Sequence, residues 1–221
     1  MAPLKYYCYP EGSPNRAPLL TIRNLNLEAE IIFVDIRKGE HLSEKFRKMN
    51  PQQCLPILDD NGFILWESRA ISQYLVTTRA PGSSLYPTDP QKRAIVDARL
   101  NLDCTLHAVS RAFFYPIHSM GETTIPELPK QRLYKLLSCL NDMLEGKAFV
   151  AGDEPTIADF SLLTSFSSYY HAGANVKHLK NLMAWYKRCE TLPGFQENEN
   201  EAIAYGKLIK SKINIKDHWD E

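Results

Sequence analysis

The first third of the chain alternates between strand-like and helix-like spacing of hydrophobic residues. Residues 4–9 (LKYYCY) and 29–36 (AEIIFVDI) are rich in aromatic and β-branched residues, which favours strands. Residues 15–27 (NRAPLLTIRNLNL), which lie between them, have the periodicity of a helix with one apolar face. Together these three segments predict a βαβ unit with parallel strands.

A helix, a hairpin and a second helix are expected after this unit. Residues 41–50 (HLSEKFRKMN) are amphipathic and predict the first helix. Residues 55–66 (LPILDDNGFILW) predict two strands joined at Asn61-Gly62, a dipeptide that suits the positive φ angles of a type I′ turn. Residues 67–78 predict the second helix, whose apolar face carries Ala70, Ile71, Tyr74 and Leu75.

The pattern changes at residues 79–91 (RAPGSSLYPTDPQ), which are rich in proline, glycine and serine. Only helical periodicity follows this segment. We therefore expect an α/β domain at residues 1–79, a linker at 80–88 and an all-helical domain at 89–221.

The expected helical domain carries recognisable helix starts and ends. Its first helix should begin with Asp89 as N-cap and Pro90 in the first turn, and it should end at Pro116. Thr156 and Asp159 have the spacing of a capping box ahead of a strongly apolar run, with Asp in place of the usual Glu. We expect that motif to be structural.

Composition excludes several classes of protein. The 26 basic and 26 acidic residues cancel, so the chain lacks the charge expected of a protein that binds nucleic acid or an anionic membrane. No apolar stretch approaches the roughly 18 residues that a membrane span needs. We expect a cytoplasmic protein with small-molecule or protein partners. The five cysteines are scattered without the spacing of a metal site, so we expect free thiols and no metal.

The segment YPEGSPNR, residues 9–16, stands between the first strand and the first helix and has two interpretations. In the local one, the glycine allows a tight turn, Ser13 is the helix N-cap, and Pro14 takes the first helical position. In the functional one, the turn directs the Ser13 hydroxyl and free backbone N–H groups at a bound anion. The turn alone does not decide between them.

Two further segments of the α/β domain suit a peptide-like ligand. Leu55-Pro56 stand at the entry of a strand, where a cis proline can leave the preceding backbone groups free to pair with an extended peptide. Glu67 and Ser68 stand at a helix start, where N–H groups, a hydroxyl and the helix dipole favour a carboxylate, and Glu67 can bind an ammonium. Glu67 and Ser68 together therefore predict a receptor for an amino-acid zwitterion.

Five short segments, in order along almost the whole chain, carry a resemblance to a known family. They are GEHL (39–42), MNPQQCLPIL (49–58), DNGFILWESRAI (60–71), SLYPTDPQKRAIVDARL (84–100) and IADFS (157–161). In combination they resemble the cytosolic glutathione transferases, nearest the insect delta and epsilon classes. The resemblance implies a thioredoxin-like N-terminal domain, an all-helical C-terminal domain, and a homodimer that joins the glutathione thiol to small hydrophobic electrophiles.

The resemblance also implies which residues hold glutathione. Leu55 and Pro56, with Cys54 beside them, match the backbone-pairing site for the cysteinyl part; the alternative is an ordinary turn. Glu67 and Ser68 match the positions that hold the γ-glutamyl end; the alternative is a simple helix cap. Arg69, which follows them, would serve the same end or the dimer seam, or else be a solvated side chain.

The glycine end of glutathione would meet two other side chains. His41 matches a residue near the glycine carboxylate, where an imidazole N–H can donate to the anion, although it could equally be a solvated surface histidine. Gln53 stands where the delta pattern has histidine, so a donor remains but a possible charge is lost. We therefore expect weaker affinity for the glycine end.

The opening turn also departs from the family pattern. The family's catalytic serine lies four residues before the arginine, a position held here by Gly12, with Ser13 one residue late relative to Arg16. Either Ser13 reaches the sulfur from a reshaped turn, or another donor acts. Tyr7 and Tyr9 are nearby, but we expect both to pack in the strand and core.

The electrophile should be bound from the long first helix of the helical domain. Asp103, on the same helix, could approach the glutamyl end of the ligand. The residues expected to face the cleft form an apolar wall with a few polar groups: His107, Ser110, Arg111, Phe114 and Tyr115.

The sequence therefore predicts a glutathione transferase with Ser13 as the thiolate donor. A ligand-carrying protein without strong catalysis is the alternative, and Gly12 is the feature that favours it. A module that only docks other proteins is a third possibility, against which the retained WESRA segment (66–70) argues.

Overall fold

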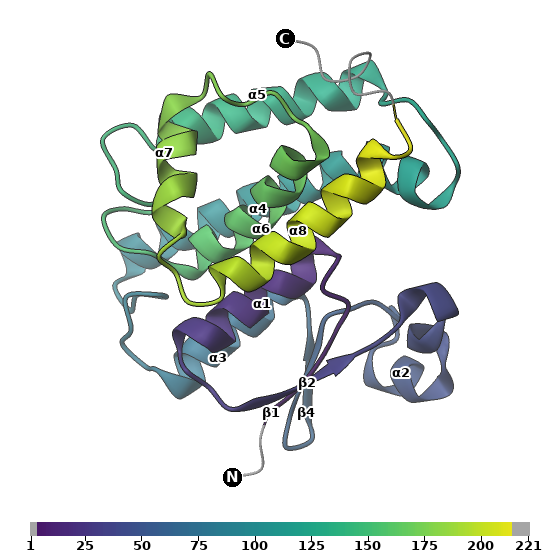
Figure 1. Cartoon of the computed structure of the whole chain (residues 1–221). Coiled ribbons are helices and arrows are strands. Elements are labelled where there is room, and N and C mark those ends of the chain that lie inside the picture. The colour runs from purple at the N-terminus through teal and green to yellow at the C-terminus, as the bar shows by residue number, and fades with distance from the viewer. Residues whose placement is uncertain (1–3, 214–221) are drawn as a thin grey trace.

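The computed structural model describes residues 4–213, so residues 214–221 of the expected helical domain lie outside it (Figure 1). An α/β part comes first: β1 (Leu4–Cys8), α1 (Ser13–Asn24), β2 (Ala29–Phe33), the 3-10 helices η1 (Ile36–Lys38) and η2 (Glu40–Leu42), α2 (Glu44–Met49), β3 (Ile57–Asp60), β4 (Phe63–Trp66) and α3 (Ser68–Arg79). A helical part follows: α4 (Pro90–Ser119), α5 (Glu127–Met143), α6 (Ile157–Ala172), α7 (Lys180–Cys189) and α8 (Phe195–Lys210).

The sheet has the strand order β2-β1-β3-β4. β1 is parallel to β2, as the βαβ unit predicts, and antiparallel to β3. The β3–β4 hairpin turns at Asn61 and Gly62, whose φ angles are 55° and 94°, which confirms the predicted turn. This is the thioredoxin-like arrangement expected from the sequence.

Helices cover both faces of the sheet. Successive strand residues point to opposite sides, and β1 has apolar side chains on both. Tyr6 and Cys8 of β1 pack on one face with residues of α1 and α3, such as Ile22 and Ile71. Tyr7 packs on the other face, edge-on to Phe46 of α2. In Figure 1 α1 and α3 lie between the sheet and the helical part.

The helical part is built around α6, which packs against α1, α4 and α8. Nearly all residues of α6 are buried, which explains its continuous apolar run. α8 approaches α6 closely at Gly206, where an added β-carbon would lie 2.4 Å from the carbonyl oxygen of His171. Glycine at this position therefore sets the spacing of the two helices.

Local capping signals determine two of the helix starts. Asp89 caps α4 by accepting hydrogen bonds from the N–H groups of Gln91 (3.1 Å) and Lys92 (2.9 Å). Thr156 and Asp159 form the predicted capping box of α6. Asp159 also accepts from the indole N–H of Trp185 at 2.9 Å, so the motif anchors α7 as well.

The prediction that α4 ends at Pro116 is wrong, because the helix continues to Ser119. A proline inside a helix removes one backbone hydrogen bond and costs about 3 kcal/mol. The neighbouring Phe114 and Ile117 are 4% and 0% exposed, and burial of such side chains contributes roughly 1.5–3 kcal/mol each. Burial therefore outweighs the lost bond, and the last turn of α4 forms.

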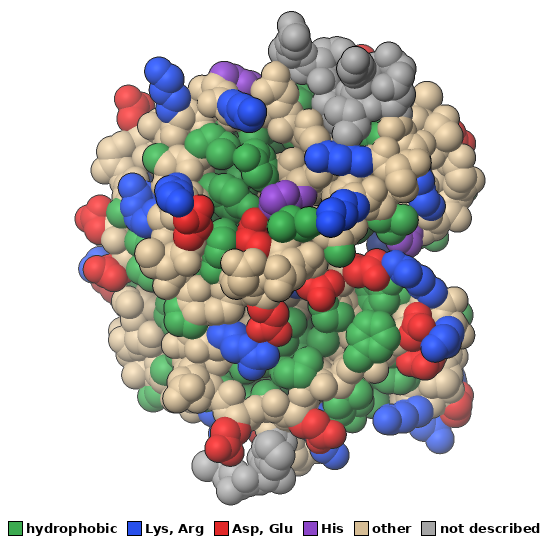
Figure 2. Space-filling model, viewed as in Figure 1, with side chains coloured by type: hydrophobic (Ala, Val, Ile, Leu, Met, Phe, Trp, Pro, Cys, Tyr) green, Lys and Arg blue, Asp and Glu red, His purple; other side chains and the backbone are tan. Residues whose placement is uncertain are grey.

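The surface carries both signs of charge. Figure 2 shows basic and acidic side chains interspersed over one face, with a notch at the right between the upper and lower parts. All five cysteines are free thiols. No helix within residues 4–213 combines the length and apolar character that crossing a bilayer requires. Within the same residues, no three His, Cys, Asp or Glu side chains are placed to share a metal ion.

Candidate active site

Three segments meet at one end of the sheet. β1 is antiparallel to β3, and Tyr7 is paired with Ile57, so the end of β1 lies beside the start of β3. Ile57 is in turn paired with Trp66, which places the end of β4 beside the same point. The turn after β1, the Leu55-Pro56 segment and the start of α3 therefore occupy the same end of the sheet.

The turn after β1 leads directly into α1. Ser13 is the first residue of the helix, Gly12 is its cap, and no side chain caps the helix, so the expectation that Ser13 is the N-cap is wrong. Gly12 has a φ of −78°, which any residue can adopt. A β-carbon added at Gly12 would lie 3.0 Å from the side-chain amide nitrogen of Asn15, so a larger residue would have to displace that amide slightly.

The Leu55-Pro56 peptide bond is cis, as the sequence suggested. Just before it, the Gln53 side chain donates to the carbonyl of Leu42 at 3.0 Å, which ties this segment to η2 and so to the helix that carries His41. The Nδ1 atom of His41 is buried without a hydrogen-bond partner among the described residues. The thiol-bearing Cys54 is exposed.

The start of α3 combines an exposed carboxylate with a strained backbone. Glu67 is exposed and has a φ of 72° with a ψ of 106°. Such backbone conformations are costly for residues with a side chain and concentrate at functional sites. Ser68, the first residue of α3, is 3% exposed.

Arg69 is held by the helical part. It forms a salt bridge with Asp103 of α4, which is 2% exposed and also accepts a hydrogen bond from the Ser161 hydroxyl at 2.5 Å. The sequence suggested that Asp103 could approach a ligand. In the structure one of its carboxylate oxygens binds protein groups, and the other is buried with no hydrogen-bond partner among residues 4–213.

A cavity of about 180 Å³ lies between the β1–α1 turn and α4. Ser13 and Gly12 line one side of it. The five residues of α4 predicted to bind the electrophile all line the other side, because their spacing of three and four residues places them on one face of the helix. These are His107, Ser110, Arg111, Phe114 and Tyr115.

Sequence reasoning missed several residues of this cavity. His118 continues the same helical face and was missed because the helix was expected to end at Pro116. Tyr9, Glu11 and Pro14 belong to the segment of residues 9–16 but were not themselves predicted to line the cavity. No local pattern marks the others, which are Ile36, Ser168, Tyr169 and Tyr205. Only the packing of α6 and α8 against α1 brings the last three into the cavity.

The cavity carries aromatic rings and mainly neutral polar groups. Burial lowers the pKa of both His107 and His118, so both imidazoles are neutral at pH 7. Burial, with the neighbouring Glu11 carboxylate, raises the pKa of Tyr9 to about 12. Arg111 lies over the Tyr115 ring, 4.8 Å from its centroid. Such a lining suits a flat, apolar ligand with a few hydrogen-bonding atoms.

The chain matches known proteins over nearly its whole length. Residues 2–77 match the family described as the N-terminal domain of glutathione S-transferase, and residues 105–193 match the corresponding C-terminal domain. Glutathione S-transferase unclassified 2 from Bombyx mori is 42% identical, with a TM-score of 0.91, and the match covers 96% of this chain and 100% of that one.

Two other solved structures are similar. A delta-class glutathione transferase from Nilaparvata lugens is 36% identical, with a TM-score of 0.90, and the match covers 95% of this chain and 100% of that one. A glutathione transferase homolog from Drosophila mojavensis, solved with bound glutathione, is 31% identical, with a TM-score of 0.89 and coverage of 96% and 99%. On these matches, and on the fold that they share with it, the chain belongs to the glutathione transferase family.

Proposed function

We propose that this glutathione transferase binds glutathione at the end of its sheet and joins the sulfur to small hydrophobic electrophiles in the neighbouring cavity. One observation carries this proposal. The Ser13 hydroxyl and the start of α1 line the same cavity as the aromatic wall of α4. A thiolate donor and an apolar electrophile site are therefore adjacent.

Glutathione would be anchored along the three segments that meet at the sheet end. The backbone of Leu55 pairs with its cysteinyl part, and Glu67 binds the ammonium of its γ-glutamyl end. Ser68 and the N-terminus of α3 bind the carboxylate there, since helix N–H groups and the helix dipole favour an anion. His41 and Gln53 serve the glycine carboxylate. The glutathione bound in the Drosophila mojavensis homolog supports a peptide site on this fold.

Activation of the thiol needs only a modest stabilisation of its anion. A thiol with a pKa of about 8.5 is a few per cent ionised at pH 7, and lowering that pKa by about 1.5 to 2 units requires about 2 to 3 kcal/mol. One or two hydrogen bonds to a charged acceptor supply that amount. Ser13 would donate its O–H to the thiolate, together with its own backbone N–H at the start of α1, because Pro14 has no N–H and that of Asn15 donates to the Gly12 carbonyl. The thiolate then attacks the electrophilic carbon, and with an aryl halide the halide leaves.

A second copy of the chain would complete the active protein. The long helix α4 has small exposed residues at Ala94, Ala98 and Ala108, and Ile95 beside them is 42% exposed. On β4, at the edge of the sheet, Phe63 is 50% exposed. These surfaces suit close packing against a partner in a dimer that buries at least about 1,200 Å². We expect the dimer in the cytoplasm.

Binding and turnover are tested separately on the purified chain. Retention on immobilised glutathione measures the peptide site, and conjugation of 1-chloro-2,4-dinitrobenzene measures transfer. We expect both. Retention without turnover would favour the carrier function, for which Gly12 at the family's serine position is the supporting observation. A chain that shows neither property would contradict both functions.

A further inference from the structure

Arg16 of α1 is buried beneath the turn that precedes Ser13. Its side chain is 1% exposed, yet all five of its N–H donors are used. One nitrogen donates to the carbonyls of Pro10 (3.0 Å) and Glu11 (3.1 Å), which belong to the turn. Another donates to α6, at the carbonyl of Thr164 (2.8 Å) and the hydroxyl of Ser168 (2.6 Å).

These bonds decide which side of the turn faces the cavity. The carbonyl of Tyr9 accepts from the N–H of Gly12 at 3.0 Å, and the carbonyl of Gly12 accepts from the N–H of Asn15 at 2.9 Å. With the two carbonyls held by Arg16, every carbonyl from residue 9 to 12 is bound within the protein. A carbonyl oxygen that faced a thiolate would repel it. Arg16 therefore holds two of these four acceptors, the carbonyls of Pro10 and Glu11, so that they are not free to face the anion.

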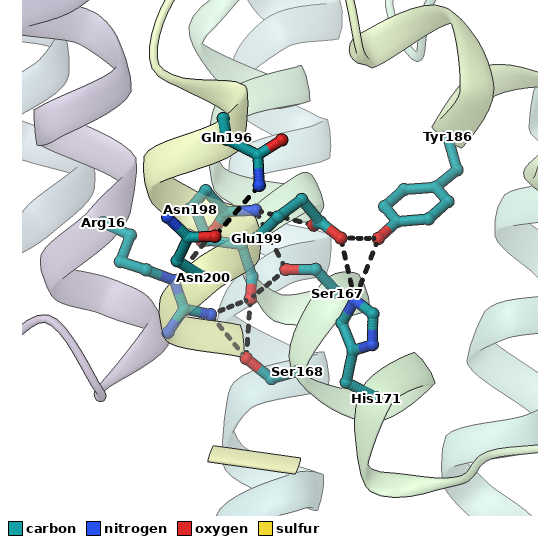
Figure 3. Close-up of polar contacts among 10 residues, drawn as sticks. Arg16, Ser167, Ser168, His171, Tyr186, Gln196, Asn198, Glu199 and Asn200 are labelled. Carbon is teal, nitrogen blue, oxygen red and sulfur yellow. Dashed lines mark hydrogen bonds and ion pairs between the residues drawn. The ribbon is translucent and has the colours of Figure 1, made fainter. Parts of the chain in front are cut away.

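The anchor of Arg16 comes from α8, far away in the sequence. The Nε atom of Arg16 donates to the side-chain oxygen of Asn198 at 2.8 Å. The amide nitrogen of Asn198 donates to the Ser167 hydroxyl at 3.1 Å and to Glu199 at 3.3 Å. Glu199 also accepts from Tyr186 of α7 at 2.5 Å. Figure 3 shows this chain of contacts, with His171 on its far side.

Among the residues that the structure describes, no carboxylate forms a direct ion pair with Arg16. Its Nε partner is an amide, and Asn198 contacts both the arginine and Glu199. Burial lowers the pKa of Arg16 to about 10, against the opposing charges of Glu201 and Glu199 and the nearby hydroxyls of Tyr205 and Tyr186. The guanidinium is therefore charged at neutral pH. A buried cation behind the turn stabilises an anion in front of it, since charges interact strongly where water is excluded.

We propose that Arg16, held in place by Asn198, is a positioning residue for the thiolate: it orients the turn that carries Ser13 and places a positive charge behind it. This inference rests on the proposed function, because it needs a thiolate at the turn. Arg16 does not line the cavity, so it would act through the turn. Through Asn198, the helical part thus controls activation of a thiol bound to the α/β part.

Asn198→Ala tests the inference, since substitution of Arg16 itself could prevent folding. We expect the pKa of enzyme-bound glutathione, followed by thiolate absorbance against pH, to rise by about half a unit or more. The thiolate fraction below that pKa, and with it kcat/KM, should fall by about threefold. The KM for glutathione should stay within about twofold, because the peptide is held by other residues.

Asn141→Ala is the matched control for lost stability. The Asn141 side chain accepts from the N–H groups of Asn181 (3.0 Å) and Leu182 (3.2 Å), so it also joins two helices, but away from the cavity. If both variants lose stability in urea and neither changes the thiol titration, the Arg16 network is only structural and the inference is wrong. A parent protein whose bound thiol titrates like free glutathione would instead contradict the proposed function, and this inference with it.

Discussion

Arg69 of α3 and Asp103 of α4 form a salt bridge in which both side chains are largely buried, 14% and 2% exposed. Arg69 directly follows Glu67 and Ser68, the two residues proposed to hold the γ-glutamyl end of glutathione. Asp103 is held in turn by Ser161 of α6. The position of the peptide site therefore depends on two helices of the helical part.

Asp103→Asn should weaken both stability and binding. Loss of one charge from a buried pair leaves its partner uncompensated and costs about 3–5 kcal/mol when both are fully buried. Because Arg69 is partly exposed, we expect about 2–3 kcal/mol in urea denaturation. The KM for glutathione should rise as the start of α3 loosens.

Asp97→Asn, at a position earlier on the same helix α4, is the control for the Asp103→Asn change. Asp97 accepts from two neutral donors, Gln73 (2.8 Å) and Tyr86 (2.9 Å), so its replacement removes no ion pair. It should cost about 1 kcal/mol. Equal losses in the two variants would show that the Arg69 charge needs no compensation.

Glu67→Gly should separate binding from folding. Its φ of 72° is unfavourable for glutamate but easily adopted by glycine, so relief of strain opposes the entropy cost of about 0.5–1 kcal/mol that glycine brings. We expect the urea midpoint of unfolding to be unchanged or slightly higher. The KM for glutathione should rise at least tenfold, because an ammonium loses a charged partner worth about 1.5–3 kcal/mol. An unchanged KM would remove Glu67 from the binding site.

Acid should destabilise the protein through His107 and His118. Burial lowers the pKa of each below its ordinary value of 6.5, so the unfolded chain binds more protons than the folded one. Stability is therefore complete above about pH 6.5 and falls as the pH drops below it. His107→Gln should flatten the fall in urea midpoint between about pH 7 and pH 5.5. His178→Gln, at an exposed position, should show the same fall in urea midpoint as the parent protein. A parent-like slope in His107→Gln would contradict the assignment.

Signals that act within a few residues made much of the fold predictable. The Asn61-Gly62 turn, the cap at Asp89 and the capping box at Thr156 each depend on neighbours in the sequence. The predicted end of α4 was wrong because a long-range contact overrides the local signal. Pro116 is a local stop signal, but burial of Ile117 against distant helices overrides it.

The candidate site was predictable where helical spacing or turn residues mark it, as at Ser13 and on one face of α4. The face of α4 that begins at His107 follows from helical spacing. Tyr205 and Asn198 come from α8, and their places beside the turn depend on packing between residues about 180 positions apart in the sequence, such as Arg16 and Asn198. The domain boundaries expected at residues 79 and 89, and the roles of the site residues, stay predictions.

Ser13→Ala tests the hydroxyl that stands one residue later than the family pattern. If Ser13 donates to the thiolate, its loss should raise the pKa of bound glutathione by about one unit, which corresponds to one charge-assisted hydrogen bond of about 1.4 kcal/mol. The rate at neutral pH should fall in parallel. Affinity for glutathione should change less, because most of the peptide is held by other residues.

Tyr9→Phe is the control, because Tyr9 lines the same cavity and carries a second hydroxyl in the segment that leads into the turn. Its ring packs against Phe33, 5.7 Å between centroids, and Arg37 lies over it. With its pKa raised to about 12, the phenol stays protonated, and we expect its loss to leave the titration of bound glutathione unchanged. A shift in Tyr9→Phe with none in Ser13→Ala would make the tyrosine the donor. If neither variant shifts the titration, the backbone N–H of Ser13 at the start of α1 holds the thiolate, and the orientation of that turn by Arg16 becomes the main determinant of reactivity.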